Sequence, residues 1–123
     1  MASNLRVLFV DDEEELVSAV TERLELRGVT AVGCLSGREA LERLARESFD
    51  VVVLDVKMPG LGGLDVVRMI NQRHPGLKVV LLTGHSSLED AQAGVELGAV
   101  AYLQKPVDLD ALLAILRSSV GEG

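Results

Sequence analysis

The sequence predicts one α/β domain in which helices cover both faces of a five-stranded parallel sheet. Five short apolar runs alternate with amphipathic helical patterns, and the connections between them are short. A chain of 123 residues with 48 % hydrophobic content is long enough for one core and leaves no room for a second domain. With right-handed crossovers, the common order of five such strands is 2-1-3-4-5, so the first and third strands lie side by side.

Five apolar runs are the predicted strands: residues 5–10, 29–34, 51–54, 79–82 and 101–103. The first run is interrupted only by Arg6 and the third is the most apolar, which is typical of strands buried on both faces. Thr30 and Gly33 dilute the second run, so we expect it nearer an edge of the sheet.

Helical periodicity fills the segments between the strands. Gly28 is a stop signal for the first helix, and the third helix runs from about residue 64 to 73. The predicted N-terminal caps are Ser36, in a capping box with Glu39, then Ser86 or Ser87, and Asp108. The side chains expected to face the sheet are Leu16, Val20, Leu24, Ala40, Leu41, Leu44, Leu88, Ala91, Val95, Leu109, Leu112, Leu113, Leu116 and Val120.

Polar residues stand where four of the predicted strands end: Asp11 and Asp12, Asp55, Thr83, and Lys105. An open α/β sheet places its site at the carboxyl ends of its strands, so these residues are expected to converge. Clustered carboxylates repel one another unless a cation compensates, and Lys105 offsets only one of three charges. The remaining charge of about -2 on hard oxygen ligands suits Mg²⁺.

This set of groups is suited to receiving a phosphoryl group. Asp55 is the natural nucleophile because it stands alone ahead of the glycine-containing loop at residues 58–63. Lys105 would neutralise charge on the phosphoryl oxygens, and Thr83 with Gly84 would offer a hydroxyl and a backbone N–H. Taken singly, an Asp or Thr at such a position is often a helix cap and a Lys a solvated surface residue. Their occurrence together at four strand ends favours a site.

Charge and composition exclude other classes. Nineteen acidic against twelve basic residues give a net charge of -7, which is the wrong sign for holding nucleic acid directly. The single Cys34 cannot form an internal disulfide, and no stretch resembles a membrane span or a signal peptide. We therefore expect a cytoplasmic protein without membrane contact.

Four segments closely resemble the receiver domain of two-component response regulators: VLFVDDEE, VVVLDVKMPGLGGLDVV, VVLLTGH and GAVAYLQKPVDLDALL. The resemblance covers nearly the whole chain and implies one receiver domain, residues 1–123, with the flavodoxin-like receiver fold. It implies that Asp55 is the phosphoacceptor for a histidine kinase or phosphotransfer protein. Such a protein is not a conventional enzyme, since it catalyses its own phosphorylation and dephosphorylation.

The resemblance also implies the ligands of the metal. Asp12, Asp55 and the backbone carbonyl of Lys57 would bind Mg²⁺, and Asp11 would act through water. Thr83 and Lys105 would contact the phosphoryl oxygens.

Further residues would govern switching and phosphate lifetime. By the same resemblance, Tyr102 moves together with Thr83, and the peptide bond from Lys105 to Pro106 is cis. Lys57 and His85 are at positions that influence how water reaches the phosphoryl group. The output would be a protein contact through the face formed by residues 88–119, with a second copy, an output domain or a partner. A stand-alone regulator and a receiver cut from a longer protein both remain open here.

Two other classes of protein share part of this pattern. A phosphatase of the haloacid dehalogenase type also uses an Asp nucleophile with Mg²⁺, but in a DxD motif after its first strand, whereas Asp55 follows the third strand and precedes Val56 and Lys57. A flavodoxin-like cofactor module would need a Ser/Thr/Gly-rich phosphate loop after the first strand, where this chain has five consecutive acidic residues, 11–15.

Overall fold

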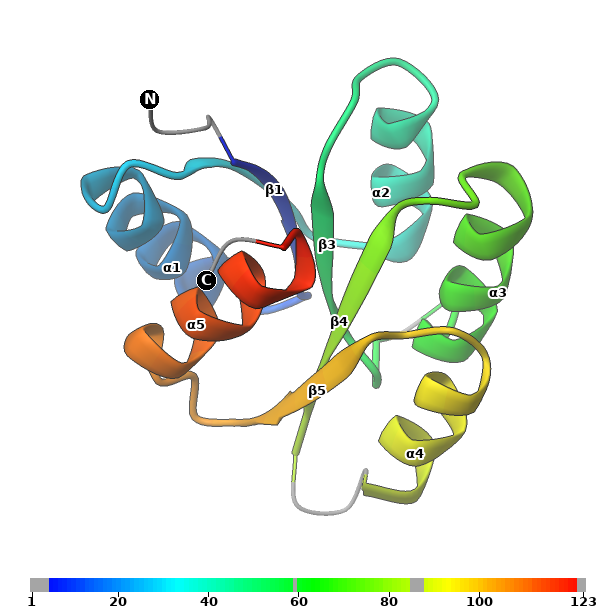
Figure 1. Cartoon of the computed structure of the whole chain (residues 1–123). Helices are drawn as coiled ribbons and strands as arrows, with labels where there is room; N and C mark the ends of the chain where they lie inside the picture. Colours follow the sequence, from blue (N-terminus) through cyan, green and yellow to red (C-terminus); the bar gives the residue numbers. More distant parts are fainter. Residues whose placement is uncertain (1–4, 59, 85–87, 122–123) are drawn as a thin grey trace.

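Five parallel strands form one sheet in the order β2-β1-β3-β4-β5 (Figure 1). The computed structural model describes residues 5–58, 60–84 and 88–121. The strands are β1 (Arg6–Val10), β2 (Thr30–Cys34), β3 (Val51–Asp55), β4 (Lys78–Thr83) and β5 (Ala101–Gln104). The predicted order and the edge position of the second strand are confirmed.

Helices cover both faces of the sheet (Figure 1). They are α1 (Glu14–Leu26), α2 (Gly37–Leu44), α3 (Gly63–Arg73), α4 (Leu88–Glu96) and α5 (Leu109–Ser119). One core cluster packs α1 and α5 against one face, and the other packs α2 and α3 against the opposite face. All five residues of β3 are buried, because this central strand is covered on both sides.

Local signals in the sequence set several helix ends as predicted. The Ser36 hydroxyl accepts a hydrogen bond from the Glu39 N–H at 3.1 Å, and one Asp108 oxygen accepts bonds from the N–H groups of Asp110 and Ala111. Gly28 follows α1 with φ of +85°, a conformation that favours glycine. The predicted caps Ser86 and Ser87 lie outside the described residues.

The inward face of α4 differs from the prediction. Val95 is 39 % exposed, whereas Gly94 lies against the sheet, where an added Cβ would be 2.2 Å from Leu81. The missing side chain lets the helix pack closely on β4, and this turns Val95 outward. The side chains of Leu88 and Ala91 lie outside the described part of the chain. In the other helices most predicted inward residues are buried, and Leu16, Leu41, Leu109 and Val120 are partly buried.

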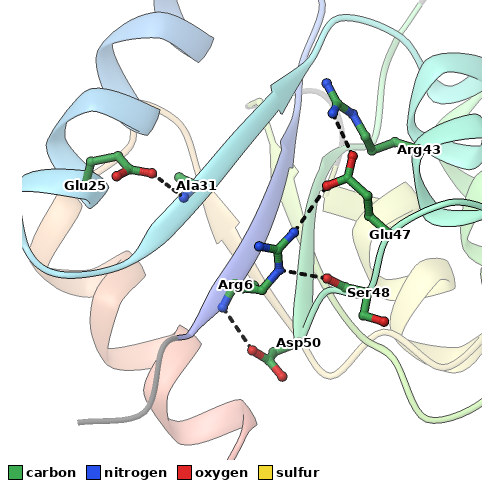
Figure 2. Close-up of polar contacts among 7 residues, drawn as sticks. All are labelled: Arg6, Glu25, Ala31, Arg43, Glu47, Ser48 and Asp50. Carbon is green, nitrogen blue, oxygen red and sulfur yellow. Dashed lines mark hydrogen bonds and ion pairs between the residues drawn. The ribbon is translucent and has the colours of Figure 1, made fainter.

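A polar network lies at the amino end of the sheet, around the start of β1 and the residues just before β3 (Figure 2). The predicted site is at the opposite, carboxyl end of the strands. Arg6 donates from Nε to the Ser48 carbonyl at 2.9 Å and forms an ion pair of 3.2 Å with Glu47. Its backbone N–H donates to Asp50, and its guanidinium lies 5.0 Å from the centre of the Phe49 ring. These contacts explain how an arginine is accommodated in an otherwise apolar strand.

Over the described ranges, none of the helices has both the length and the hydropathy that crossing a membrane requires.

Candidate functional site

Three carboxylates converge where β1 and β3 end. The two strands pair directly, with Val10 opposite Leu54, so the residues that follow them are neighbours. One oxygen from each of Asp11, Asp12 and Asp55 lies within 4.8 Å of the others. Asp11 and Asp55 are buried, whereas Asp12 is exposed. The structure therefore brings together the acidic residues that the sequence predicted.

Lys105 reaches this cluster from the connection between β5 and α5. Its Nζ lies 2.7 Å from Oδ2 of Asp11 and 3.2 Å from Oδ2 of Asp55. The backbone N–H of Lys105 donates to the Thr83 carbonyl at 2.7 Å, which ties the end of β5 to the end of β4. The bond between Lys105 and Pro106 is cis, as the resemblance implied.

The buried Oδ2 atom of Asp11 has an incomplete environment. Within the described part of the chain no donor makes a hydrogen bond of regular geometry to this atom. The Lys105 ammonium is close enough for an ion pair but is not oriented as a hydrogen-bond donor. A buried carboxylate oxygen in this state has lone pairs available to accept a hydrogen bond from water or to coordinate a cation.

Burial and charge shift the pKa values of the two central groups. Burial raises the pKa of Asp55 above its ordinary value of 3.8, and the nearby Asp11 adds to the rise, while the Lys57 N–H and the Lys105 ammonium oppose it. Burial alone would lower the pKa of Lys105, but its polar contacts with Asp11 and Glu13, together with the charge of Asp55, leave it well above the usual range. Lys105 therefore stays charged at neutral pH.

Backbone groups hold the acidic side chains in place. The Lys57 N–H donates to Oδ1 of Asp55 at 3.1 Å, and the Glu13 N–H donates to Oδ1 of Asp11 at 2.9 Å. Each bond fixes one carboxylate oxygen, which leaves the Oδ2 atoms of Asp11 and Asp55 facing Lys105. The site is therefore ordered by its own loops before any ligand binds.

The sequence interpretation missed two residues that shape the site. Gly63 begins α3 against the end of β3, where an added Cβ would lie 2.5 Å from the Val56 carbonyl oxygen. Glu13 lies beside the cluster, with Oε1 at 3.1 Å from Nζ of Lys105. Gly63 was visible only as part of a flexible loop, and Glu13 only as one of several acids near a helix start.

The remaining predicted residues surround the cluster. Thr83 is 1 % exposed at the end of β4, and Tyr102 is 39 % exposed on β5. The Nζ of Lys57 lies 3.8 Å from Oδ2 of Asp90 on α4. A cleft of about 440 Å³ beside this pair is lined by residues of the loop after β3 and the start of α3. His85 lies outside the described residues.

The model of the response regulator receiver domain matches residues 7–117. The chain belongs to this family. Phosphoryl acceptance is the known role of the receiver domain, and receiver domains of response regulators work with histidine kinases. Membership sets aside the haloacid dehalogenase and flavin-module alternatives.

Relatives and solved structures agree with this membership. The receiver is 37 % identical over 115 residues to the DNA-binding transcriptional regulator NtrC of Escherichia coli, covering 93 % of this chain and 24 % of that protein. It is 38 % identical to the response regulator MprA of Mycolicibacterium vanbaalenii, covering 93 % of this chain and 49 % of that protein. The chain thus spans about a quarter of the first relative and about half of the second.

The fold is shared with solved receiver domains. A response regulator receiver domain protein from Clostridium thermocellum superposes with a TM-score of 0.90 at 33 % identity, covering 94 % of both chains. A CheY-like receiver domain protein from Methanospirillum hungatei gives a TM-score of 0.90 at 29 % identity, covering 96 % of this chain and 94 % of that one.

Proposed function

We propose that Asp55 is the phosphoacceptor of this receiver. The supporting observation is that Asp55 is buried at the end of the central strand, with Oδ2 held 3.2 Å from the Lys105 ammonium and Oδ1 fixed by a backbone N–H. A carboxylate oxygen of Asp55 attacks the phosphorus of a phosphohistidine. The P–N bond breaks, the histidine nitrogen leaves, and an acyl phosphate forms on Asp55. Later attack by water releases inorganic phosphate and restores the carboxylate.

The acidic cluster fits a divalent cation. Asp12, Asp55 and the Lys57 carbonyl would hold Mg²⁺, and Asp11 would act through water, which is consistent with the incomplete environment of its Oδ2 atom. When bound, the cation would neutralise charge on the acidic cluster and on the incoming phosphoryl oxygens. Carboxylate and carbonyl oxygens are the ligands that this hard ion prefers.

Lys105 and Thr83 complete the proposed site. The Lys105 ammonium donates to a phosphoryl oxygen, and its raised pKa keeps it charged for this task. The Thr83 hydroxyl, at the end of the neighbouring strand, donates to another oxygen, with the Gly84 N–H beside it. These groups stabilise negative charge that grows on the phosphoryl oxygens during transfer.

The donor would be a histidine kinase or phosphotransfer protein, and the whole chain, residues 1–123, would act as one receiver domain. The output would be a protein contact through the face of residues 88–119, with a second copy, an output domain or a partner and not with nucleic acid directly. Val95, Val100 and Tyr102 are exposed apolar or aromatic residues on this face. Beside them is a groove of about 500 Å³ lined by Val100, Ala101, Ala114, Ile115, Ser118 and Ser119.

We also place the receiver in the cytoplasm. Burial raises the pKa of Cys34 to about 11, with a smaller contribution from Glu39. The thiol therefore stays protonated at neutral pH. The proposed location rests instead on the use of a single, free cysteine, which is typical of a reducing compartment.

Intact mass spectrometry tests the acceptor. Incubation with acetyl phosphate or phosphoramidate and Mg²⁺ is expected to add one labile phosphoryl group to the wild type. Asp55→Asn should remain unlabelled, and Asp65→Asn, which removes an exposed acid of α3, should be labelled like the wild type. Equal labelling of Asp55→Asn and the wild type contradicts the assignment.

A further inference from the structure

Glu13 is an additional carboxylate on Lys105 and lies outside the predicted metal-ligand set. Its Oε1 accepts a hydrogen bond from Lys105 Nζ at 3.1 Å, across 92 residues of sequence. The residue occupies the N-cap position of α1, yet its side chain makes no capping hydrogen bond. The position of this carboxylate is therefore set by its contact with Lys105 and not by capping of the helix.

Lys105 faces three carboxylates at once. Its Nζ lies 2.7 Å from Asp11, 3.1 Å from Glu13 and 3.2 Å from Asp55. Hydrogen bonds to Glu13 and Asp55 use two of the three N–H groups of this ammonium, and the Asp11 oxygen lies on its remaining side as an ion pair. A phosphoryl group carried by Asp55 brings more anionic oxygens to this ammonium than the Asp55 carboxylate alone does, so Asp11 and Glu13 compete with those oxygens for Lys105.

Exposure decides which carboxylate leaves. Asp55 becomes part of the acyl phosphate, so the choice is between Asp11, whose side chain is 0 % exposed, and Glu13, whose side chain is 64 % exposed. Releasing a buried carboxylate leaves its charge unpaired away from water, which is costly. Releasing Glu13 returns its carboxylate to solvent at little cost.

We propose that Glu13 is a resting-state counter-ion of Lys105 that competes with the phosphoryl group and so opposes phosphorylation of this receiver. The inference rests on the proposed role of Lys105 toward the phosphoryl oxygens. Because the pair between Glu13 and Lys105 exists only before the phosphoryl group arrives, it stabilises the unphosphorylated state alone. Glu13 is thus a positioning residue that acts through Lys105 and does not touch the reacting atoms.

The test compares Glu13→Gln with Glu14→Gln. The second variant removes the same charge from the exposed neighbouring position, so it controls for long-range charge effects. The first measurement is NMR of the lysine ε-methylene groups in metal-free protein, where only Lys57, Lys78 and Lys105 contribute. The Lys105 signal should move in Glu13→Gln and stay in place in Glu14→Gln.

The second measurement is the affinity for beryllofluoride at saturating Mg²⁺. Glu13→Gln should bind about two- to fivefold more tightly than Glu14→Gln, the size expected from an exposed ion pair. Its initial rate of labelling by acetyl phosphate should rise in the same direction. Affinity for Mg²⁺ alone should be the same in the two variants, because Glu13 is not a metal ligand in this proposal.

Three outcomes overturn the proposal. They are an unmoved Lys105 signal in Glu13→Gln, equal beryllofluoride affinity in the two variants, and a loss of Mg²⁺ affinity specific to Glu13→Gln, which would make Glu13 a metal ligand. None of these affects the assignment of Asp55. Failure of the proposed function itself would show differently, as a wild type that neither binds beryllofluoride nor is labelled.

Discussion

The Lys57 ammonium lies 3.8 Å from Oδ2 of Asp90, so an ion pair joins the loop after Asp55 to the first turn of α4. The Lys57 and Asp90 side chains are 61 % and 43 % exposed, and ion pairs in contact with solvent contribute about 0–1 kcal/mol to stability. The pair therefore matters less for folding than for where it holds the lysine, two residues after Asp55.

The first prediction concerns the lifetime of the phosphoaspartate. Lysine at this position cannot accept a proton from attacking water, and its long side chain can cover the phosphoryl group. The phosphoaspartate of Lys57→Asn is therefore expected to hydrolyse faster than that of the wild type. Asp90→Asn removes the ion pair that holds Lys57 to α4, and its phosphoaspartate should hydrolyse at the wild-type rate or more slowly. The decay of the phosphorylated mass after removal of the donor measures these rates, and an unchanged or slower decay in Lys57→Asn contradicts the prediction.

The second prediction is that divalent cation binding depends on Asp12 and Asp55. Removing either carboxylate leaves too few anionic oxygens for a hard cation, so Asp12→Ala should lose roughly tenfold or more in Mg²⁺ affinity. Glu14→Ala removes one charge from the exposed start of α1 and should retain nearly full affinity. Titration calorimetry with Mg²⁺ or Mn²⁺ provides the comparison. If Asp12→Ala binds as the wild type does, the proposed ligand set is wrong.

The third prediction follows from the raised pKa of Asp55, whose main cause is burial. The folded protein binds this proton more tightly than the unfolded chain does, so the stability linked to Asp55 is present at low pH and is lost as pH rises through the folded pKa. At neutral pH without metal, Asp55→Asn should therefore melt a few degrees above the wild type. The difference should shrink as pH falls toward the ordinary value of 3.8.

Thermal melts in EDTA over a range of pH measure this effect. Asp65→Asn, at an exposed position paired with Arg68, should show no comparable gain at neutral pH. An Asp55→Asn protein that melts at or below the wild-type temperature at pH 7 would show that the bond to Lys105 outweighs the cost of burial.

Much of the fold was predictable because the hydrophobic pattern and the local signals for helix ends indicate the same elements. Apolar runs marked the strands, and local signals such as Ser36 with Glu39 marked helix ends. The convergence of Asp11, Asp12 and Asp55 followed from topology alone, since parallel strands end on one edge of the sheet.

The parts that sequence did not predict depend on contacts between distant residues. The outward turn of Val95 results from close packing of Gly94 on Leu81, which no helical pattern reveals. The bond from Glu13 to Lys105 spans 92 residues, and within the sequence Glu13 resembles any acidic residue near a helix start. Contacts of this kind can be identified only from the three-dimensional structure.

The fourth prediction concerns the network at the amino end of the sheet (Figure 2). Arg6→Gln removes the bond to the Ser48 carbonyl and the ion pair with Glu47, so the melting temperature should fall by about 2–5 °C. Arg46→Gln, at an exposed position of the segment after α2, should change it less. Labelling by acetyl phosphate should be normal in both, because this network lies at the far end of the strands from Asp55. Loss of labelling in a folded Arg6→Gln protein would contradict that separation.

The last prediction is that phosphorylation moves Tyr102. Thr83 is buried beside the site and Tyr102 is 39 % exposed on the adjacent strand, so a turn of Thr83 toward the phosphoryl oxygens would vacate space for the ring to move inward. Beryllofluoride with Mg²⁺ should shift the Tyr102 NMR signals, which are easily assigned because the chain has one tyrosine. It should also change self-association or partner binding through residues 88–119. Thr83→Ala should weaken both responses while Asp55 remains available for labelling. If beryllofluoride binds yet leaves the ring environment, the oligomeric state and partner affinity unchanged, the switching model fails even if Asp55 is phosphorylated.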